Sequence, residues 1–69
     1  MTVANLRDSA DGDVVVTFLD SARFYRLSRT HPRFDELLTA LRTSLADARA
    51  VRVRLAGPTS DVIEDVQPP

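Results

Sequence analysis

The chain has 69 residues, of which nine are basic, ten are acidic and 43% are apolar, and its net charge is −1. This length suits one domain over residues 1–69, and the composition is typical of an ordinary globular protein. The absence of cysteine excludes a disulfide framework and a thiolate metal site. No apolar run approaches the roughly 20 residues of a membrane span, and no signal-peptide pattern is present, so we expect a cytoplasmic protein without membrane contact.

The charge is divided unevenly along the chain. Residues 1–22 and residues 55–69 each carry a net charge of −3, whereas residues 23–54 carry +5. All nine basic residues are arginine. The guanidinium group suits contacts with phosphate or carboxylate, but a GC-rich coding sequence produces the same bias without any selection for binding.

The first segment, Thr2–Leu6, predicts a short strand. It is followed by a turn in which Gly12 and several aspartates favour a tight reversal. Asp8, Asp11 and Asp13 offer oxygen atoms of the kind that bind calcium, but the distal glutamate of a calcium loop is absent. We therefore expect a solvated turn and no metal site.

The next two segments, Val14–Leu19 and Arg23–Leu27, predict a β-hairpin around Asp20-Ser21-Ala22. With a two-residue turn, the predicted pairs are Val16 with Leu27 and Phe18 with Tyr25, all four on the buried face. The outer face then carries Val15, Thr17, Leu19, Phe24 and Arg26. A slip of one residue would exchange the two faces, and no Asn-Gly or Asp-Gly is present to define the turn.

The longest helical period in the chain runs from Thr30 to Arg49 and predicts a helix over residues 32–48. Its apolar stripe is expected to consist of Phe34, Leu37, Leu38, Leu41, Leu45 and Ala48. Pro32 suits the first helical turn, where its missing N–H is not needed. Thr30 or His31 is then expected as the N-cap.

Two further strands are predicted after the helix. Val51, Val53 and Leu55 alternate with Arg52 and Arg54, so the two arginines are expected on the outer face. A turn follows at residues 57–60. The last strand, Val62–Val66, alternates irregularly, which suggests a bulge or an edge strand. Prolines end the sheet, and residues 67–69 are expected to form a short tail.

The order β-β-β-α-β-β predicts a mostly β member of the α+β class, with five antiparallel strands and one amphipathic helix between the third and fourth strands. This order, together with the closing segments Ala50–Leu55 and Val62–Val66, resembles the OB-fold of small bacterial domains. The resemblance covers nearly the whole chain in topology but includes no family motif. It implies a five-stranded OB-like barrel, and an open sheet with the helix on one face is the alternative.

The sequence offers little chemistry. His31 is the single histidine and stands at a helix start, and no serine lies in the surroundings of a nucleophile. The sequence has no glycine-rich phosphate loop and no paired carboxylates aimed at a common pocket. We therefore expect no catalytic residue, no metal, no cofactor and no enzymatic activity.

A binding function remains. The OB resemblance implies a binding surface on the outer face of the second and third strands, with the loops at residues 7–13 and 56–60. The candidate binding residues are Thr17, Leu19, Phe24, Arg26, Arg52 and Arg54.

Two kinds of partner fit that surface. An apolar pair, Leu19 and Phe24, bordered by Arg26, has the composition of a protein-binding hot spot. We therefore expect a small accessory module that contacts another protein or its own copy. The alternative is weak binding of single-stranded nucleic acid through Phe24, Arg26, Arg52 and Arg54. The acidic first loop and the net charge of −1 favour a protein or homo-oligomeric partner over nucleic acid.

Overall fold

The computed structural model describes residues 1–68, so Pro69, the end of the predicted 67–69 tail, lies outside the described residues. Within that range the elements follow the expected order. They are β1 (Val3–Asp8), β2 (Val14–Phe18), β3 (Phe24–Leu27), α1 (Phe34–Asp47), β4 (Arg52–Leu55) and β5 (Ile63–Gln67). The fold is therefore α+β, and its strands pair in antiparallel ladders.

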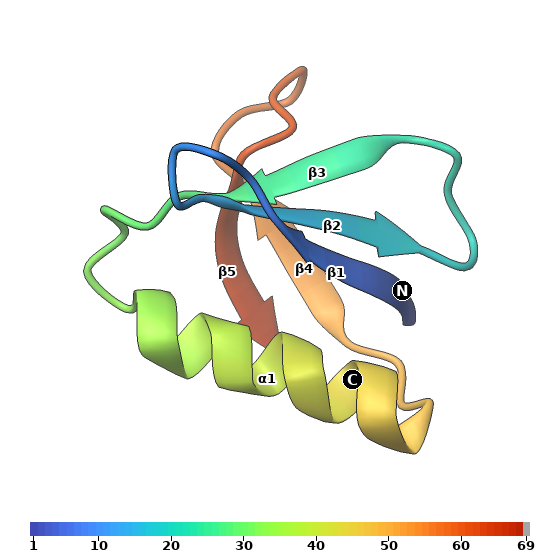
Figure 1. Cartoon of the computed structure of the whole chain (residues 1–69). Coiled ribbons are helices and arrows are strands. Elements are labelled where there is room, and N and C mark those ends of the chain that lie inside the picture. Colours follow the sequence, from blue (N-terminus) through green and yellow to red (C-terminus); the bar gives the residue numbers. More distant parts are fainter. Residues whose placement is uncertain (69) are drawn as a thin grey trace.

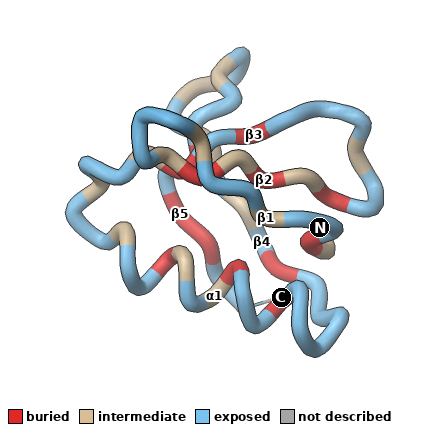
Figure 2. The backbone as a smooth tube through the Cα atoms, in the orientation of Figure 1, coloured by how far each residue is buried: buried red, intermediate tan, exposed pale blue. Residues whose placement is uncertain are grey.

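The strands form two sheets, one with the order β1-β2-β3 and one made of β4 and β5. The helix α1 runs beneath both sheets and packs against β1 and β5 (Figure 1). The buried residues lie where the two sheets and the helix face one another (Figure 2). The core consists of Val3, Val14, Val16, Phe18, Tyr25, Leu27, Leu37, Leu41, Val51, Ile63 and Val66.

The β2–β3 hairpin has the expected faces but not the expected pairing. Val16, Phe18, Tyr25 and Leu27 are buried, as predicted, whereas Phe24 and Arg26 point outward. The ladder pairs Val14 with Leu27 and Val16 with Tyr25, so the predicted pairing of Val16 with Leu27 is wrong by two residues. A shift of the strand pairing by two residues leaves every side chain on the same face of the sheet, because successive side chains of a strand point to opposite faces.

A longer loop accounts for the shift. The two-residue turn is replaced by the segment Leu19–Arg23. Ser21 makes the hydrogen bonds that hold this loop together. Its N–H donates to the Phe18 carbonyl, and its hydroxyl accepts from the Arg23 N–H at 3.3 Å. The same hydroxyl lies 3.2 Å from the Tyr25 hydroxyl. Without Asn-Gly or Asp-Gly, a two-residue turn has no residue suited to positive φ.

The helix begins later than predicted. Its N-cap is Arg33 rather than Thr30 or His31, and within the described residues no side chain makes a capping hydrogen bond. Pro32 therefore precedes the helix instead of occupying its first turn. Asp35 and Glu36 in the first turn compensate in part, because negative charge is favourable at the positive end of the helix dipole. The helix ends at Asp47, and the C-cap residue, Ala48, adopts the left-handed conformation with φ of 53°.

The buried stripe of α1 is rotated relative to the predicted one. Leu37, Leu41 and Ser44 are its buried residues, whereas Leu45, expected in the core, is 41% exposed. The Ser44 hydroxyl accepts from the Val3 N–H at 3.2 Å and donates to the Arg49 carbonyl. Ser44 is buried because it satisfies two backbone groups, one of which belongs to β1.

The β4–β5 ladder contains the predicted irregularity. Arg54 pairs with Asp65 while Leu55 pairs with Ile63, so Glu64 is an extra residue and forms a bulge. The bulge breaks the alternation of β5 and allows Ile63, Asp65 and Val66 all to be buried. The strand also begins and ends one residue later than the predicted Val62–Val66.

Single bridges connect the two sheets. Thr2 pairs with Ala50 in antiparallel fashion, and Arg26 pairs with Val62 in parallel fashion. Backbone hydrogen bonds accompany them, from the Val51 N–H to the Met1 carbonyl and from the Arg26 N–H to the Asp61 carbonyl. Over the described residues these bridges do not extend into a continuous closed ladder. In the same range, no helix is long and apolar enough to cross a membrane.

Candidate functional site

The ladders of the three-stranded sheet define its outer face. Residues that lie opposite one another in a sheet share a face, so two rows of side chains point away from the core. The rows are Arg7, Val15 and Arg26, and beside them Asn5, Thr17 and Phe24. Three of the predicted binding residues, Thr17, Phe24 and Arg26, therefore lie on this face.

A hollow of about 270 Å³ lies at the β3 side of this face. Its lining comes from β2, from β3 and from the segment just before β5: Val15, Phe24, Tyr25, Arg26, Asp61 and Val62. Phe24 is 68% exposed and Val62 is 39% exposed, although both are large apolar residues. The parallel bridge between Arg26 and Val62 explains why residues so distant in sequence meet here. We call this feature the Phe24 hollow.

Charged groups of both signs surround the Phe24 hollow. Arg23 forms an ion pair with Asp61 and lies over the Tyr25 ring, 5.5 Å from its centroid. Arg26 approaches Asp13 at 3.9 Å. That distance is well beyond a charge-assisted hydrogen bond of about 2.8 Å. The Arg26 guanidinium is therefore held loosely and faces solvent.

The other two predicted arginines lie elsewhere. Arg52 and Arg54 belong to β4 and line a separate hollow of about 220 Å³ with Val53, Asp65 and Gln67. Arg54 lies 3.8 Å from Glu64, and both side chains are largely exposed. The structure therefore places Arg52 and Arg54 in a different sheet from Thr17, Phe24 and Arg26.

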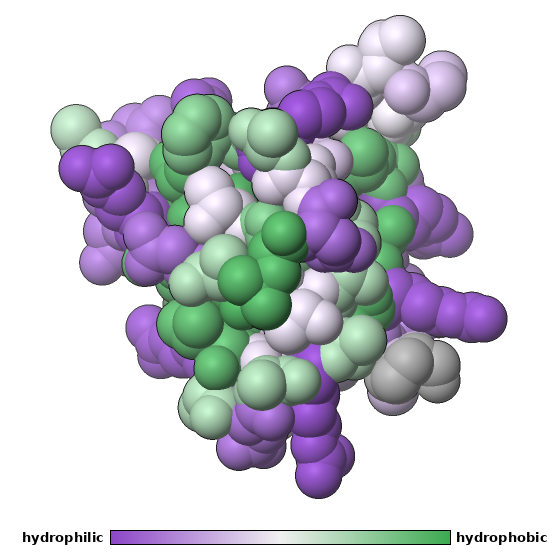
Figure 3. All heavy atoms as spheres, turned by 90° about the vertical axis from the view of Figure 1, so that its right-hand side faces the viewer, coloured by the Kyte–Doolittle hydropathy of each residue, from purple (hydrophilic) through white to green (hydrophobic). Residues whose placement is uncertain are grey.

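Leu19 occupies a third position. It is 72% exposed and lies in the loop just beyond β2, and it is not among the described residues that line the Phe24 hollow. That loop is on the side of the molecule seen in Figure 3, where apolar residues gather in the middle and hydrophilic ones project at the margins. Leu19 is therefore exposed outside the hollow.

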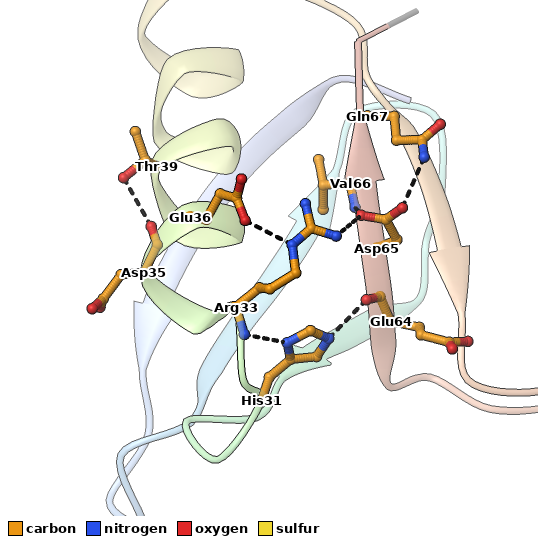
Figure 4. A network of polar contacts seen from close by, with 9 residues as sticks. All are labelled: His31, Arg33, Asp35, Glu36, Thr39, Glu64, Asp65, Val66 and Gln67. Carbon is orange, nitrogen blue, oxygen red and sulfur yellow. Dashed lines mark hydrogen bonds and ion pairs between the residues drawn. The ribbon is translucent and has the colours of Figure 1, made fainter.

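The most connected polar cluster joins the start of the helix to β5 (Figure 4). The His31 Nδ1 accepts from the Arg33 N–H at 2.9 Å, so its Nε2 carries the proton and donates to the Glu64 carbonyl at 2.8 Å. Arg33 donates to Glu36 at 2.6 Å and to Asp65 at 3.2 Å. These contacts fasten the β3–α1 loop to the bulge.

Asp65 is the buried carboxylate of this cluster, with 6% of its surface exposed. Burial by itself raises the pKa of Asp65, but hydrogen bonds from Gln67 and the Val66 N–H and the charge of Arg33 outweigh it. The net result is a pKa below the usual value of 3.8. The hydrogen bond from Arg33 likewise lowers the pKa of Glu36.

The remaining sites are small. A third hollow, of about 250 Å³, lies between the end of α1 and β4, beside Ser44 and Pro68. All three hollows are smaller than the roughly 300–1,000 Å³ typical of small-molecule sites. In the part of the chain that the structure describes, no three acidic, histidine or cysteine residues are grouped as a metal would require. The Asp11 carboxylate instead accepts from the Ser9 hydroxyl, which lowers the pKa of Asp11.

Asp61 and Val62 are part of this region, although we did not predict them as binding residues, and Arg7, expected at the start of the 7–13 loop, belongs to β1 instead. The sequence places Arg7 and Asp61 at or beside loops, and only the β1–β2 ladder shows that Arg7 shares a row with Arg26. Asp61 and Val62 reach the site through the contact of β3 with the segment before β5. No local pattern could have indicated that contact.

Comparison with protein-family models, with curated proteins and with solved structures found no match for this chain.

Proposed function

We propose that this chain is a small, non-catalytic binding module that contacts protein through the outer face of β2 and β3. The observation that carries the proposal is the Phe24 hollow, where two exposed apolar residues, Phe24 and Val62, adjoin a loosely held arginine, Arg26. Aromatic and arginine side chains around a shallow apolar depression are the usual anchors of protein interfaces.

The architecture that we propose for the module is an OB-like barrel. The two ladders and the two single bridges together would form a ring in which β1 adjoins β4 and β3 adjoins β5. The main-chain bonds at Arg26 and Val51 support such a closure. It would protect sheet edges that otherwise present unpaired backbone groups.

The second candidate function is weak binding of single-stranded nucleic acid. It is favoured by the row that brings Arg7 beside Arg26, next to Phe24, because stacking on an aromatic ring and contacts to phosphate suffice for such binding. Two observations rank it lower. Asp13 and Asp61 stand beside the same arginine and repel phosphate, and Arg52 and Arg54 lie in the other sheet.

Two binding assays distinguish these functions. In the first, a displayed library of random peptides is selected against the parent, and the selected peptides are tested against Phe24→Ser and against Leu19→Ser. We expect Phe24→Ser to weaken peptide binding by about 30-fold or more, the effect of a hot-spot residue. Both positions are exposed, so the variants should retain the thermal stability of the parent within about 0.5 kcal/mol.

In the second assay, a labelled single-stranded oligonucleotide is titrated at about 50 mM and about 200 mM salt. We expect weak binding that collapses at the higher salt, because only screened charge contacts support it. Tight binding at the higher salt, together with a library that yields no peptide dependent on Phe24, would replace the proposed function with the nucleic-acid one.

A further inference from the structure

The size of the Phe24 hollow restricts what can occupy it. At about 270 Å³ it is smaller than a typical cofactor or drug site, but it can accept a large side chain such as that of phenylalanine. Its walls are apolar at Val15, Phe24 and Val62. An aromatic side chain of another protein surface would therefore fill it well.

The charge around the hollow restricts the partner further. Arg26 and Asp61 both line it, and both side chains are about half exposed. The ion pair of Asp61 with Arg23 uses the carboxylate oxygen Oδ1, so Oδ2 is the oxygen that would receive a positive group of a partner. A partner with charges of one sign, such as a nucleic acid or a strongly acidic peptide, would place a like charge against one of them. A partner with one positive and one negative group at matching places would satisfy both.

A second copy of the same chain is such a partner. When a surface meets its own copy across a two-fold axis, residue i contacts residue j and residue j contacts residue i. Arg26 of each copy would then face Asp61 of the other. The aromatic side chain that the hollow can accept is also present on the same surface, namely Phe24.

We infer that the chain forms a symmetric dimer about the Phe24 hollow, in which Phe24 of each copy enters the hollow of the other and two Arg26–Asp61 pairs flank the contact. This inference rests on the proposed function and names its partner. A stable interface buries roughly 800 Å² on each protein, which is more than a sixth of the 4538 Å² surface of the described chain. A domain of this size has a small core and gains stability from such burial, and a net charge of −1 opposes it only weakly.

Charge exchange provides a specific test. Asp61→Arg would place arginines opposite arginines in its own dimer, and Arg26→Asp would place aspartates opposite aspartates. In a mixed dimer of the two variants, the native Arg26 of one copy faces the native Asp61 of the other. The arginine introduced at position 61 faces the aspartate introduced at position 26. Both flanking pairs are therefore restored only in the mixed dimer. Sedimentation equilibrium measures the dissociation constant of the parent, of each variant and of the equimolar mixture.

We expect the parent to dimerise, each charge variant to dimerise at least 10-fold more weakly, and the mixture to recover an affinity close to that of the parent. We also expect Phe24→Ser to weaken the dimer by about 30-fold or more. Leu45→Ser, at a partly exposed leucine on α1 that does not line the hollow, should leave the dimer unchanged. Circular dichroism confirms that each variant is folded, and recovery in the mixture cannot arise from two misfolded variants.

The inference is wrong if the parent remains monomeric up to about 1 mM, where even weak association becomes visible, or if the mixture associates no better than its components. Weakening by Leu19→Ser but not by Phe24→Ser would also overturn it and would place the interface on the loop surface. If the parent is monomeric but still binds peptides through Phe24, the second copy is the wrong partner and the proposed function stands. If neither dimerisation nor peptide binding depends on Phe24, both the dimer and the proposed function are wrong.

Discussion

At the scale of single residues, Asp65 departs most clearly from what its type suggests. An aspartate in a strand is normally exposed, yet Asp65 is buried opposite Arg54 and accepts hydrogen bonds from Arg33 and from Gln67. The bulge at Glu64 turns the carboxylate toward the start of the helix. A buried charge is tolerated only when it is paired and hydrogen-bonded, and here both conditions are met.

The low pKa of Asp65 predicts how stability depends on pH. A carboxylate whose pKa is lower in the folded than in the unfolded chain stabilises the fold at pH values above its usual 3.8, and that contribution is lost as the pH falls toward the folded pKa. Asp65→Asn should therefore lower the urea midpoint at neutral pH, and the difference from the parent should shrink between about pH 5 and about pH 2.5. Urea titrations across this range provide the measurement.

Asp20→Asn, in the exposed β2–β3 loop, is the matched control and should keep the parental midpoint at neutral pH. An Asp65→Asn protein as stable as the parent at neutral pH would show that the charge of Asp65 in the cluster of Figure 4 contributes nothing to stability.

At the scale of elements, the helix shows how packing selects among residues with similar helical positions. Leu41 and Leu45 both belong to the apolar stripe expected from the period, but only Leu41 is fully buried. Ser44 is buried at the place expected for Leu45, and its hydroxyl accepts a hydrogen bond from the N–H of Val3. The backbone of β1 therefore sets the rotation of the last helical turn, because a buried N–H without a partner is costly.

The two leucines provide a test of this rotation. Leu41→Ala should destabilise the chain by about 2–5 kcal/mol, because it removes a fully buried side chain and leaves a cavity. In a domain of this size that loss lowers the melting temperature by about 8 °C or more. Leu45→Ala should cost far less. Thermal unfolding followed by circular dichroism compares the variants, and equal losses at both positions would contradict the observed rotation.

At the scale of the whole molecule, the question is whether the two sheets behave as one unit. They are joined by single bridges at Thr2 and Arg26, by the main-chain bond of Val51 and by the helix beneath them. If these contacts close the structure cooperatively, they should break only when the whole domain unfolds.

Amide hydrogen exchange measures this directly. We expect the N–H groups of Arg26 and Val51 to exchange as slowly as that of Val16 in the middle of β2, because each donates to a carbonyl of the neighbouring segment. The N–H of Gly12, in the exposed turn between β1 and β2, should exchange much faster. Exchange of Arg26 and Val51 at the rate of Gly12 would show that the two sheets open independently.

The sequence by itself determined the order of the elements, the presence of the helix, the inner and outer faces of the hairpin and the irregularity of the last strand. These features follow from the local spacing of apolar residues, because a strand repeats every two residues and a helix every 3.6, and both repeats are visible among neighbouring residues. For the same reason, Phe24 and Arg26 could be predicted to face outward together.

The tertiary structure alone decided the pairing offset of the hairpin, the exchange of Leu45 for Ser44 in the core, the burial of Asp65 and the division of the arginines between two sheets. Each of these depends on a contact between segments far apart in the chain, such as Val3 with Ser44 or Arg26 with Val62. Such contacts are chosen by the free energy of the whole packed arrangement, to which side-chain burial and the pairing of backbone groups both contribute. The Phe24 hollow results from such long-range contacts, because Asp61 and Val62 reach Phe24 only when the chain has folded.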